Sequence, residues 1–465
     1  MNEQPFLLCE APVIPKSSKD YYNFSELLKN INTLLDKTGA EKRLIDLALV
    51  KFNKEKSGKS PGWTAQFRNS ISFIIRCNLV RRLRTMNYRA FSVTASDSKL
   101  VQWFIRRGQL EGFTEELSGK GLSKSSLERY DKILSAEDIE AVIYEVCASV
   151  SAKEWAGNTG WNQPLSVQDI FVDCTCLESN IHFPVDWILM RDVVRTLSLS
   201  IDCIRRHGLK HRIKNPELFI REINQLCIEM SGVSRSKKDS KNKRKRVFRK
   251  MKAVVKCVER HAIRYQSLLV KQRTSLTDFT QAEADQVLKR IESVLSQIPS
   301  AIKQAEDRII REQKVADSEK TLSLYNPDIS TIFRGKAGSA IEFGNTLYLA
   351  ESSDGLIVDF KLHKDRAPAD CRMVEESLTR CKKAYGGINS ITADRGFHSP
   401  ENTQLLAKEK AINNILNKSP RLMAESFKDP SFRAAQKRRA QTEGRIGILK
   451  NVFLGDCLMG KSFEH

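Results

Sequence analysis

Two short apolar stretches that lie far apart in this sequence each end on an aspartate. Residues 169–173 are rich in β-branched and aromatic side chains and predict a strand that ends on Asp173. Residues 388–394 repeat the pattern and end on Asp394. A carboxylate among apolar residues is costly unless a positive charge or a metal ion offsets it, and a strand holds it rigidly. Both aspartates are therefore candidate metal ligands. The alternative for each is a solvent-facing strand position or a turn.

A third candidate acid, Glu443, lies in a helix predicted for residues 431–453. The spacing places Arg439, Glu443 and Lys450 on one face of that helix. Glu443 is the only acid of the stretch, and its neighbours include many basic residues: Lys437, Arg438, Arg439, Arg445 and Lys450. The alternative is a surface glutamate paired with Arg439 one turn earlier.

Three acids from separate elements suit phosphoryl transfer on nucleic acid. That reaction commonly uses two divalent ions about 4 Å apart. Mg²⁺ prefers oxygen ligands and takes only a few carboxylates, and Mn²⁺ can substitute for it. We therefore predict that Asp173, Asp394 and Glu443 converge on one site for two Mg²⁺ ions, with carboxylates within about 8 Å of one another.

The residues around the three acids form recognisable motifs. They are Asp173-Cys-Thr175 with Glu178, Asn180-Ile181-His-Phe-Pro184-x-Asp186, Ala393-Asp394-Arg395-Gly396-Phe397-x-Ser399, Arg439-x3-Glu443-x6-Lys450, and residues 333–344 ahead of the second acid. This set resembles the bacterial insertion-sequence DDE transposases, which have an RNase-H-like catalytic core. The resemblance covers about residues 165–460, with a looser likeness over residues 61–150.

The resemblance implies the fold class and the activity. The fold would be α/β, with an RNase-H-like mixed sheet flanked by helices, a long helical insertion and an N-terminal all-α domain. The enzyme would cut DNA at the ends of the element and join the freed 3′-hydroxyl to target DNA. Asp173, Asp394 and Glu443 would hold the two metal ions. DNA contacts are assigned to Arg395, Arg439 and Lys450. The implied partners are terminal inverted repeats and target DNA, bound by a homodimer at the nucleoid in the cytoplasm.

Two features depart from the family pattern. Relatives carry a tyrosine three positions before the arginine, and here that position is Gln436. No role of that tyrosine in gripping flanking DNA is therefore carried over. The chain also stops at His465, 22 residues after Glu443, where relatives usually continue through further helical sequence. We accordingly expect a shortened copy with the three acids in place.

Composition also indicates a polyanionic partner. The formal net charge is +21, with 77 basic against 56 acidic residues, and 41% of the residues are apolar. Such an excess favours nucleic acid as partner, ahead of an anionic membrane surface. The 11 cysteines show neither a pairing pattern nor zinc-site spacing, which is typical of a reducing compartment. No N-terminal signal pattern and no run of about 18 apolar residues is present, so we expect a soluble, intracellular protein.

The length of 465 residues predicts roughly two to four domains. We expect a helical lead in residues 1–60 and a helical, arginine-rich domain in residues 61–151. The latter resembles a helix-turn-helix DNA-binding module, the alternative being a packing domain with a solvated basic face. The catalytic core would comprise residues 165–186 and 330–465. Residues 187–329 would form the insertion, in which three amphipathic segments predict an antiparallel bundle.

A basic run inside the insertion is the second candidate DNA contact. Residues 235–252 hold eleven basic residues and one acid. A run with this charge is predicted to be disordered alone and to be ordered by DNA phosphates, without reading sequence. The alternative is a solvated linker that binds nothing. The residues assigned to DNA binding are Lys243, Arg244, Lys245 and Arg246.

Further elements are expected in the second part of the core. A hairpin is predicted from residues 341–350 and 356–362, joined by Asp354-Gly355. Helices are expected at residues 370–385 and 400–410, and a last strand at residues 411–416. Two other functions fit the same features: an RNase-H-like nuclease that only hydrolyses, and a catalytically inactive DNA-binding derivative of a transposase.

Overall fold

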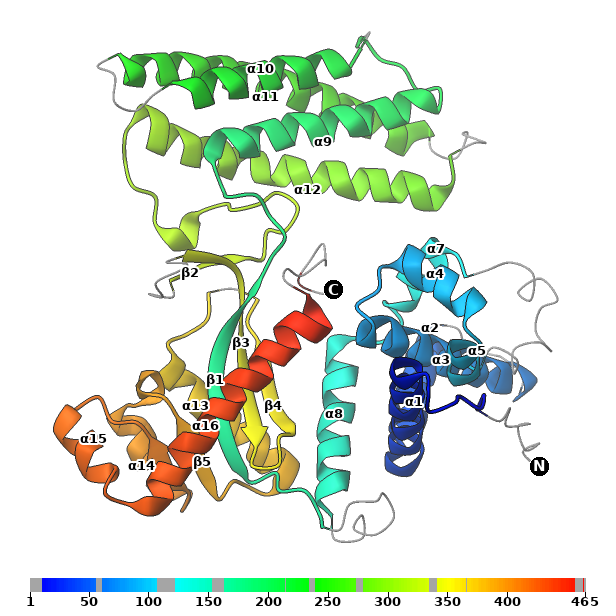
Figure 1. Ribbon diagram of the computed structural model, residues 1–465. Helices are drawn as coiled ribbons and strands as arrows, with labels where there is room; N and C mark the ends of the chain where they lie inside the picture. Colours follow the sequence, from blue (N-terminus) through cyan, green and yellow to red (C-terminus); the bar gives the residue numbers. More distant parts are fainter. Residues whose placement is uncertain are drawn as a thin grey trace.

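The structure is a computed structural model, and it describes residues 11–55, 61–106, 122–152, 163–213, 215–233, 239–272, 279–333, 341–364, 366–455 and 463. In these residues the chain is an α/β protein with one mixed sheet of six strands (Figure 1). In the view of Figure 1 a helical bundle lies above the sheet, and the N-terminal helices lie to its right.

The N-terminal helices share one hydrophobic core, in which Leu28, Ile71, Phe91 and Phe104 are buried. Most of the helices begin at a short polar residue, and Ser135 begins α8 with a capping box. The helices are α1 (Lys19–Thr38), α2 (Ala40–Glu55), α3 (Pro61–Leu83), α4 (Tyr88–Asp97), α5 (Lys99–Phe104), α7 (Lys124–Tyr130) and α8 (Ala136–Ser151).

Helix α8 connects these helices to the sheet through a buried carboxylate. Tyr144 of α8 donates a 2.5 Å hydrogen bond to Asp359 of strand β4 (Ile357–Leu362). Asp359 is fully buried, and it also accepts hydrogen bonds from Ser377 at 2.5 Å and from Arg380 at 2.7 and 2.8 Å. Because the charge is paired and hydrogen-bonded on several sides, its burial is tolerated.

Strand β1 (Asp169–Glu178) lies in the middle of the sheet. On one side it pairs antiparallel with β3 (Ile341–Ser352), which pairs antiparallel with β2 (Ser330–Phe333) at one end and with β4 at the other. On the other side, β5 (Ser390–Ala393) is parallel to β1, and β6 (Ile412–Ile415) is parallel to β5. A strand lies at each predicted place and the hairpin is confirmed, but β1 runs further than predicted, and β2 was not predicted.

Helices cover both faces of the sheet. Helices α13 (Asp370–Tyr385) and α14 (Pro400–Lys408) belong to the larger core, with buried Ile170 and Val172 of β1. The opposite face carries a smaller core of Leu177, Leu347, Leu349 and Ile446. The helix on that face is α16 (Pro430–Ile448), which follows α15 (Pro420–Ser426) and continues as a π-helix, Leu449–Leu454.

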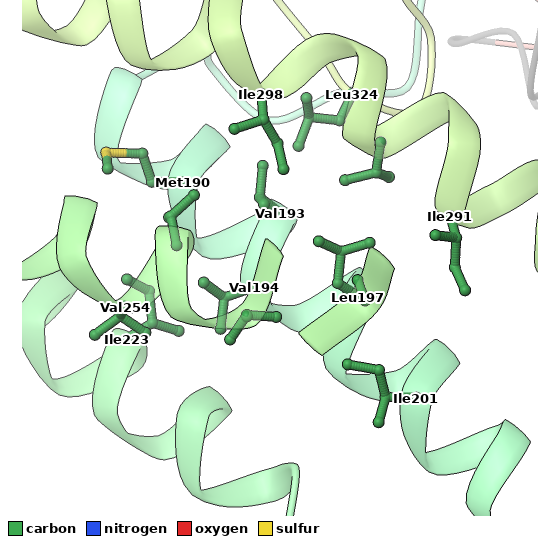
Figure 2. Close-up of a cluster of buried hydrophobic side chains, with 14 of the residues drawn as sticks. Met190, Val193, Val194, Leu197, Ile201, Ile223, Val254, Ile291, Ile298 and Leu324 are labelled. Carbon is green, nitrogen blue, oxygen red and sulfur yellow. The ribbon is translucent and has the colours of Figure 1, made fainter. Parts of the chain in front are cut away.

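The segment between β1 and β2 forms a bundle of four long helices. Met190, Val194, Leu197 and Ile201 make the buried seam of α9, and Ile291 and Ile298 pack near them from α12 (Figure 2). The bundle consists of α9 (Asp186–Arg206), α10 (Glu217–Gly232), α11 (Ser240–Gln272) and α12 (Gln281–Ala305), and α12 ends in a π-helix, Glu306–Ile310. No helix in the described ranges is long and apolar enough to cross a membrane.

Three expectations about local structure are wrong. Strand β1 does not end at Asp173: pairing with β3 continues to Glu178, so Asp173 is in mid-strand. The bundle has four helices instead of three, because α10 also buries an apolar seam. Residues 235–238 of the basic run lie outside the described residues, and the rest is helical from Ser240 onward, because Val247, Phe248 and Met251 are buried in the bundle core. The predicted domain limits stay predictions.

Candidate active site

The register of two parallel strands places the first two acids side by side. Phe171 of β1 pairs with Thr392 of β5, the last pair of this ladder, and Asp173 and Asp394 each follow two residues later, Asp394 just beyond the end of β5. Adjacent strands lie about 4.8 Å apart, and residues two apart point to the same face. Both aspartates therefore lie on the face that α16 covers, and both are half-buried.

Asp394 is held by the turn that follows β5. Its Oδ1 accepts a 2.8 Å hydrogen bond from the backbone N–H of Gly396. A Cβ on Gly396 would lie 3.0 Å from this oxygen and 3.0 Å from Oδ2 of Asp370. The glycine therefore leaves room for two carboxylates, and a fourth acid, Asp370 at the start of α13, lies next to the site.

The pKa of Asp173 is affected by the charges of the other two acids, Asp394 and Glu443. Burial raises the pKa of this carboxyl, and the negative charges of Asp394 and Glu443 raise it further. The N–H of Cys174, which donates a 2.8 Å hydrogen bond to Oδ1, and the charge of Arg439 act in the opposite direction. The net effect is a raised pKa. The three acids thus concentrate negative charge that a bound cation would relieve.

Gln436 fixes the first half of α16 over the strand ends. Its side-chain Nε2 donates hydrogen bonds to the carbonyl oxygens of Ala393 at 3.2 Å and Asn414 at 2.6 Å. Ala393 is the last residue of β5 and immediately precedes Asp394, and Asn414 lies in β6. The amide of Gln436 therefore ties α16 to the sheet.

Glu443 lies two helical turns beyond Gln436, and its side chain is 59% exposed. Its Oε1 is 3.2 Å from Nη1 of Arg439, the pair that the alternative interpretation predicted. Even so, its charge is close enough to raise the pKa of Asp173. Glu443 is therefore at the exposed rim of the site and is engaged with Arg439.

As placed, no three His, Cys, Asp or Glu side chains in the described ranges are close enough together to hold a metal ion. The chemistry of the donors nevertheless fits magnesium. Asp173 and Asp394 each use Oδ1 for a backbone N–H, and Oδ2 of each accepts no hydrogen bond from described residues. Hard carboxylate oxygens with excess negative charge suit Mg²⁺ or Mn²⁺. The expected spacing of the three carboxylates stays a prediction.

The other predicted DNA contacts near the site differ in their surroundings. Lys450 is 3.8 Å from Oε1 of Glu178 at the end of β1, and its side chain is largely covered. Arg395 directly follows Asp394 and is exposed, with no ion pair to a described residue. Arg439 is half-buried between Glu443 and the sheet. Of the three cations, Arg395 is thus open to solvent, whereas Arg439 and Lys450 each lie near an acid.

The basic residues of α11 form a separate surface at the start of that helix. Lys243 and Arg246 are exposed, and Arg249 and Lys250 continue the same surface. These four form no ion pair with described residues. Lys245 differs, because it is 3.0 Å from Glu312, and Arg244 lies over the ring of Trp187 at 5.3 Å. The predicted DNA contacts of α11 thus fall into two groups. Some cations are exposed and form no ion pair with described residues, and others already contact an acid or an aromatic ring.

Sequence reasoning missed three residues that shape this site. Glu351 is buried under α16 and binds two of its arginines, Gln436 ties α16 to the strand ends, and Asp370 adjoins Asp394. The signal for Glu351 was available, since it is an acid inside an apolar strand run, as Asp173 is. Gln436 and Asp370 carry no such signal, because their roles depend on contacts between elements.

Comparison of the chain with protein-family models, with curated proteins and with solved structures gives no match.

Proposed function

We propose that this chain is a DNA transposase of a bacterial insertion sequence, which cuts DNA at the element ends and joins them to target DNA. The observation that carries the proposal is that Asp173 of β1 and Asp394, just after the parallel strand β5, lie close enough for their charges to interact, on the face covered by the helix that bears Glu443. The motif resemblance supports the same assignment, because these are the three acids that it selects.

The sheet supports an RNase-H-like core as the fold of this catalytic unit. Its first strand is central, an antiparallel hairpin lies on one side, and two parallel strands connected through helices lie on the other. The separate hydrophobic cores of the N-terminal helices and of the α9–α12 bundle support an arrangement with a helical N-terminal domain and a helical insertion.

In the proposed reaction the acids form the metal site and the cations bind DNA. Two Mg²⁺ ions, when bound, supply activation of the attacking oxygen and stabilisation of the leaving oxygen. Asp173 of β1 and Asp394, just after β5, would hold them. Glu443 completes the site when its exposed side chain turns away from Arg439. That turn frees the guanidinium of Arg439 for a phosphate of the DNA end, beside Lys450 and Arg395.

The direct test uses the DNA that flanks the gene. Supercoiled plasmid carrying both flanks is incubated with the protein and Mg²⁺ or Mn²⁺. We expect metal-dependent cuts at inverted repeats and products in which the freed 3′ end is joined to target DNA. Cleavage without joined products would support the nuclease, and DNA binding with no cleavage in either metal would contradict a catalytic function.

Lys450 tests the phosphate contacts at the site. Replacement by alanine removes one cation but leaves the three acids in place. We expect weaker binding to element ends and a salt dependence whose slope falls by about 0.9, the contribution of one phosphate contact on duplex DNA. Filter binding at several salt concentrations measures both. An unchanged slope would show that Lys450 makes no phosphate contact and stays paired with Glu178 in the DNA complex.

The open cations of α11 test the second predicted DNA contact. Lys243, Arg246, Arg249 and Lys250 lie on one exposed side of the helix, opposite its buried residues. Replacing all four with glutamine should weaken binding to every duplex alike and reduce the salt slope by up to about 3.6, because each contact releases counterions. Fluorescence anisotropy with duplexes of unrelated sequence measures this.

A matched variant controls for net charge. Arg264, Lys271, Lys289 and Arg290 are also exposed, in the second half of α11 and on α12. Their replacement by glutamine changes the charge of the bundle by the same amount at a different place. We expect little change in the salt slope for this variant. Equal losses for the two variants would mean that only net charge matters and that the start of α11 is no specific contact.

A further inference from the structure

The buried glutamate of strand β3 makes a charged contact between the sheet and α16. Glu351 is 1% exposed and lies opposite Phe171 in the sheet, on the face that α16 covers. Its Oε1 is 3.1 Å from Nε of Arg445 and 3.4 Å from Nη2 of Arg438. One carboxylate of the sheet therefore binds two arginines that are two turns apart on the helix.

Arg438 extends this contact to the backbone and to an aromatic ring. It donates hydrogen bonds to the carbonyl oxygens of Ser352 at 2.9 Å and Ser353 at 3.2 Å. Its guanidinium also lies 4.7 Å from the centre of the ring of Phe171, a cation–π contact. Arg438 is thereby held in one geometry against the end of β3, and it holds α16 there.

These contacts flank the proposed metal ligand. Glu443 lies between Arg438 and Arg445 in the sequence of α16. The helical spacing places the two arginines on one face of the helix and Glu443 on another. Arg438 and Arg445 face Glu351, whereas Arg439 and Glu443 face the aspartates. A change in the position of the helix at Glu351 thus changes the distance between Glu443 and Asp173.

We propose that Glu351 is a positioning residue, which holds α16 at the angle that brings Glu443 to the metal site. This role rests on the proposed function, since it concerns the same acids. In this role Glu351 acts through the α16 residues that bind it, chiefly Arg438 and Arg445. Burial alone would raise the pKa of this carboxyl, but hydrogen bonds from residues of α16 hold it below its ordinary range, so it is charged at neutral pH.

Two substitutions at Glu351 test this role. Glu351→Gln keeps the shape but removes the charge that both arginines bind. Glu351→Asp keeps the charge but withdraws the carboxylate by one methylene. This second variant provides the same test if Glu351→Gln folds poorly. We expect both to raise the Mn²⁺ dissociation constant about tenfold or more, the usual effect of losing a residue that orients a metal ligand. Electron paramagnetic resonance of free Mn²⁺ measures this without any cleavage.

Hydrogen exchange gives a second readout that needs no metal. Amides of α16 should exchange at least about tenfold faster in Glu351→Gln, because the helix loses the charged contact that both arginines make with the sheet. Amides of α13, on the opposite face, should keep their wild-type rates. Binding of a non-specific duplex should stay within about twofold, since the exposed cations of α11 are unchanged.

Asp359→Asn is the matched control. Asp359 is also a buried acid of the same sheet that binds an arginine, but its partners are Arg380, Ser377 and Tyr144 on the other face. We expect this variant to speed exchange in α8 and α13, to leave α16 unchanged, and to leave the Mn²⁺ dissociation constant within about twofold of wild type. Any general effect of losing a buried charge would appear in both variants.

The outcomes separate two failures. If both Glu351 variants shift Mn²⁺ binding and α16 exchange no more than Asp359→Asn does, the positioning role is overturned and the proposed function stands. If the wild-type protein binds no Mn²⁺ and cuts no flanking DNA, the proposed function is overturned, and the positioning role with it. Faster α16 exchange together with weaker Mn²⁺ binding in the Glu351 variants alone would support the proposal.

Discussion

Glu443→Gln is expected to lower the rate of cleavage at element ends by about 10⁴-fold or more, as the loss of single catalytic residues does in other enzymes. The substitution keeps the shape of the side chain but removes the charge that completes the metal site with Asp173 and Asp394. Affinity for the ends should stay within about twofold of wild type. Cleavage of pre-nicked ends in Mn²⁺, where demands on the site are lowest, measures the rate, and gel shift measures the affinity.

The control is the same chemical change on the neighbouring helix. Glu425 of α15 is exposed, so Glu425→Gln should cleave at the wild-type rate. If Glu443 is only the surface partner of Arg439, its replacement would leave cleavage unchanged and tighten DNA binding slightly by removing a repulsive charge. Robust cleavage by Glu443→Gln would therefore remove this residue from the proposed site.

The strand-borne acids could be predicted because the signal is local. An aspartate in an apolar, β-branched run is expensive in any fold, so Asp173 and Asp394 stand out without knowledge of the sheet. Their adjacency could not be read from either run alone, because it depends on the parallel register of β1 and β5. The same limit hid the true length of β1, since residues after Asp173 extend the strand by pairing with β3.

Charge misled the prediction for the basic run of α11. Eleven basic residues indicate repulsion and disorder, yet three apolar side chains at helical spacing, Val247, Phe248 and Met251, are enough to pack the helix into the bundle. Acids of the following segment then offset part of the charge, as Glu312 does for Lys241 and Lys245. Apolar periodicity therefore outweighed net charge in this run. The helix forms because its apolar side chains make contacts with the other helices of the bundle.

The largest effect on stability is expected in the N-terminal helices, at the buried pair of Arg76 and Glu41. Arg76 is 1% exposed and binds both oxygens of Glu41 at 2.7 Å. It also donates hydrogen bonds to Asn32 of α1 at 2.8 Å and to the carbonyl of Phe104 at 3.1 Å. Ser72 donates a further 2.6 Å hydrogen bond to Glu41. One guanidinium thus joins α1, α2, α3 and the end of α5.

Arg76→Met should reduce the free energy of unfolding of these helices by about 3–5 kcal/mol, because it leaves the charge of Glu41 buried without its main partner. Arg106, 3.6 Å from Glu41, offsets only part of this loss. Urea titration followed by hydrogen exchange of α2 and α3 measures the change. Arg43→Met is the control: Arg43 pairs with Glu145 at the surface, where such pairs contribute less than about 1 kcal/mol.

The double variant Glu41→Leu with Arg76→Met tests whether the loss comes from the unpaired charge. Replacing a buried ion pair with apolar residues of similar size is often neutral, so we expect most of the stability to return. The pair also predicts acid sensitivity. Burial alone would raise the pKa of Glu41, but the hydrogen bond and charge of Arg76 outweigh it and hold the pKa below its ordinary value.

A carboxyl with a lowered pKa stabilises the folded state above its unfolded pKa, and this stability is lost as the pH falls through the folded pKa. The wild-type helices should therefore lose stability progressively below about pH 4, where an unfolded glutamate is protonated. The double variant has no carboxyl at this position and should lose much less over the same range. Unfolding curves at several pH values compare the two. Equal acid sensitivity would show that a group other than Glu41 governs the acid response.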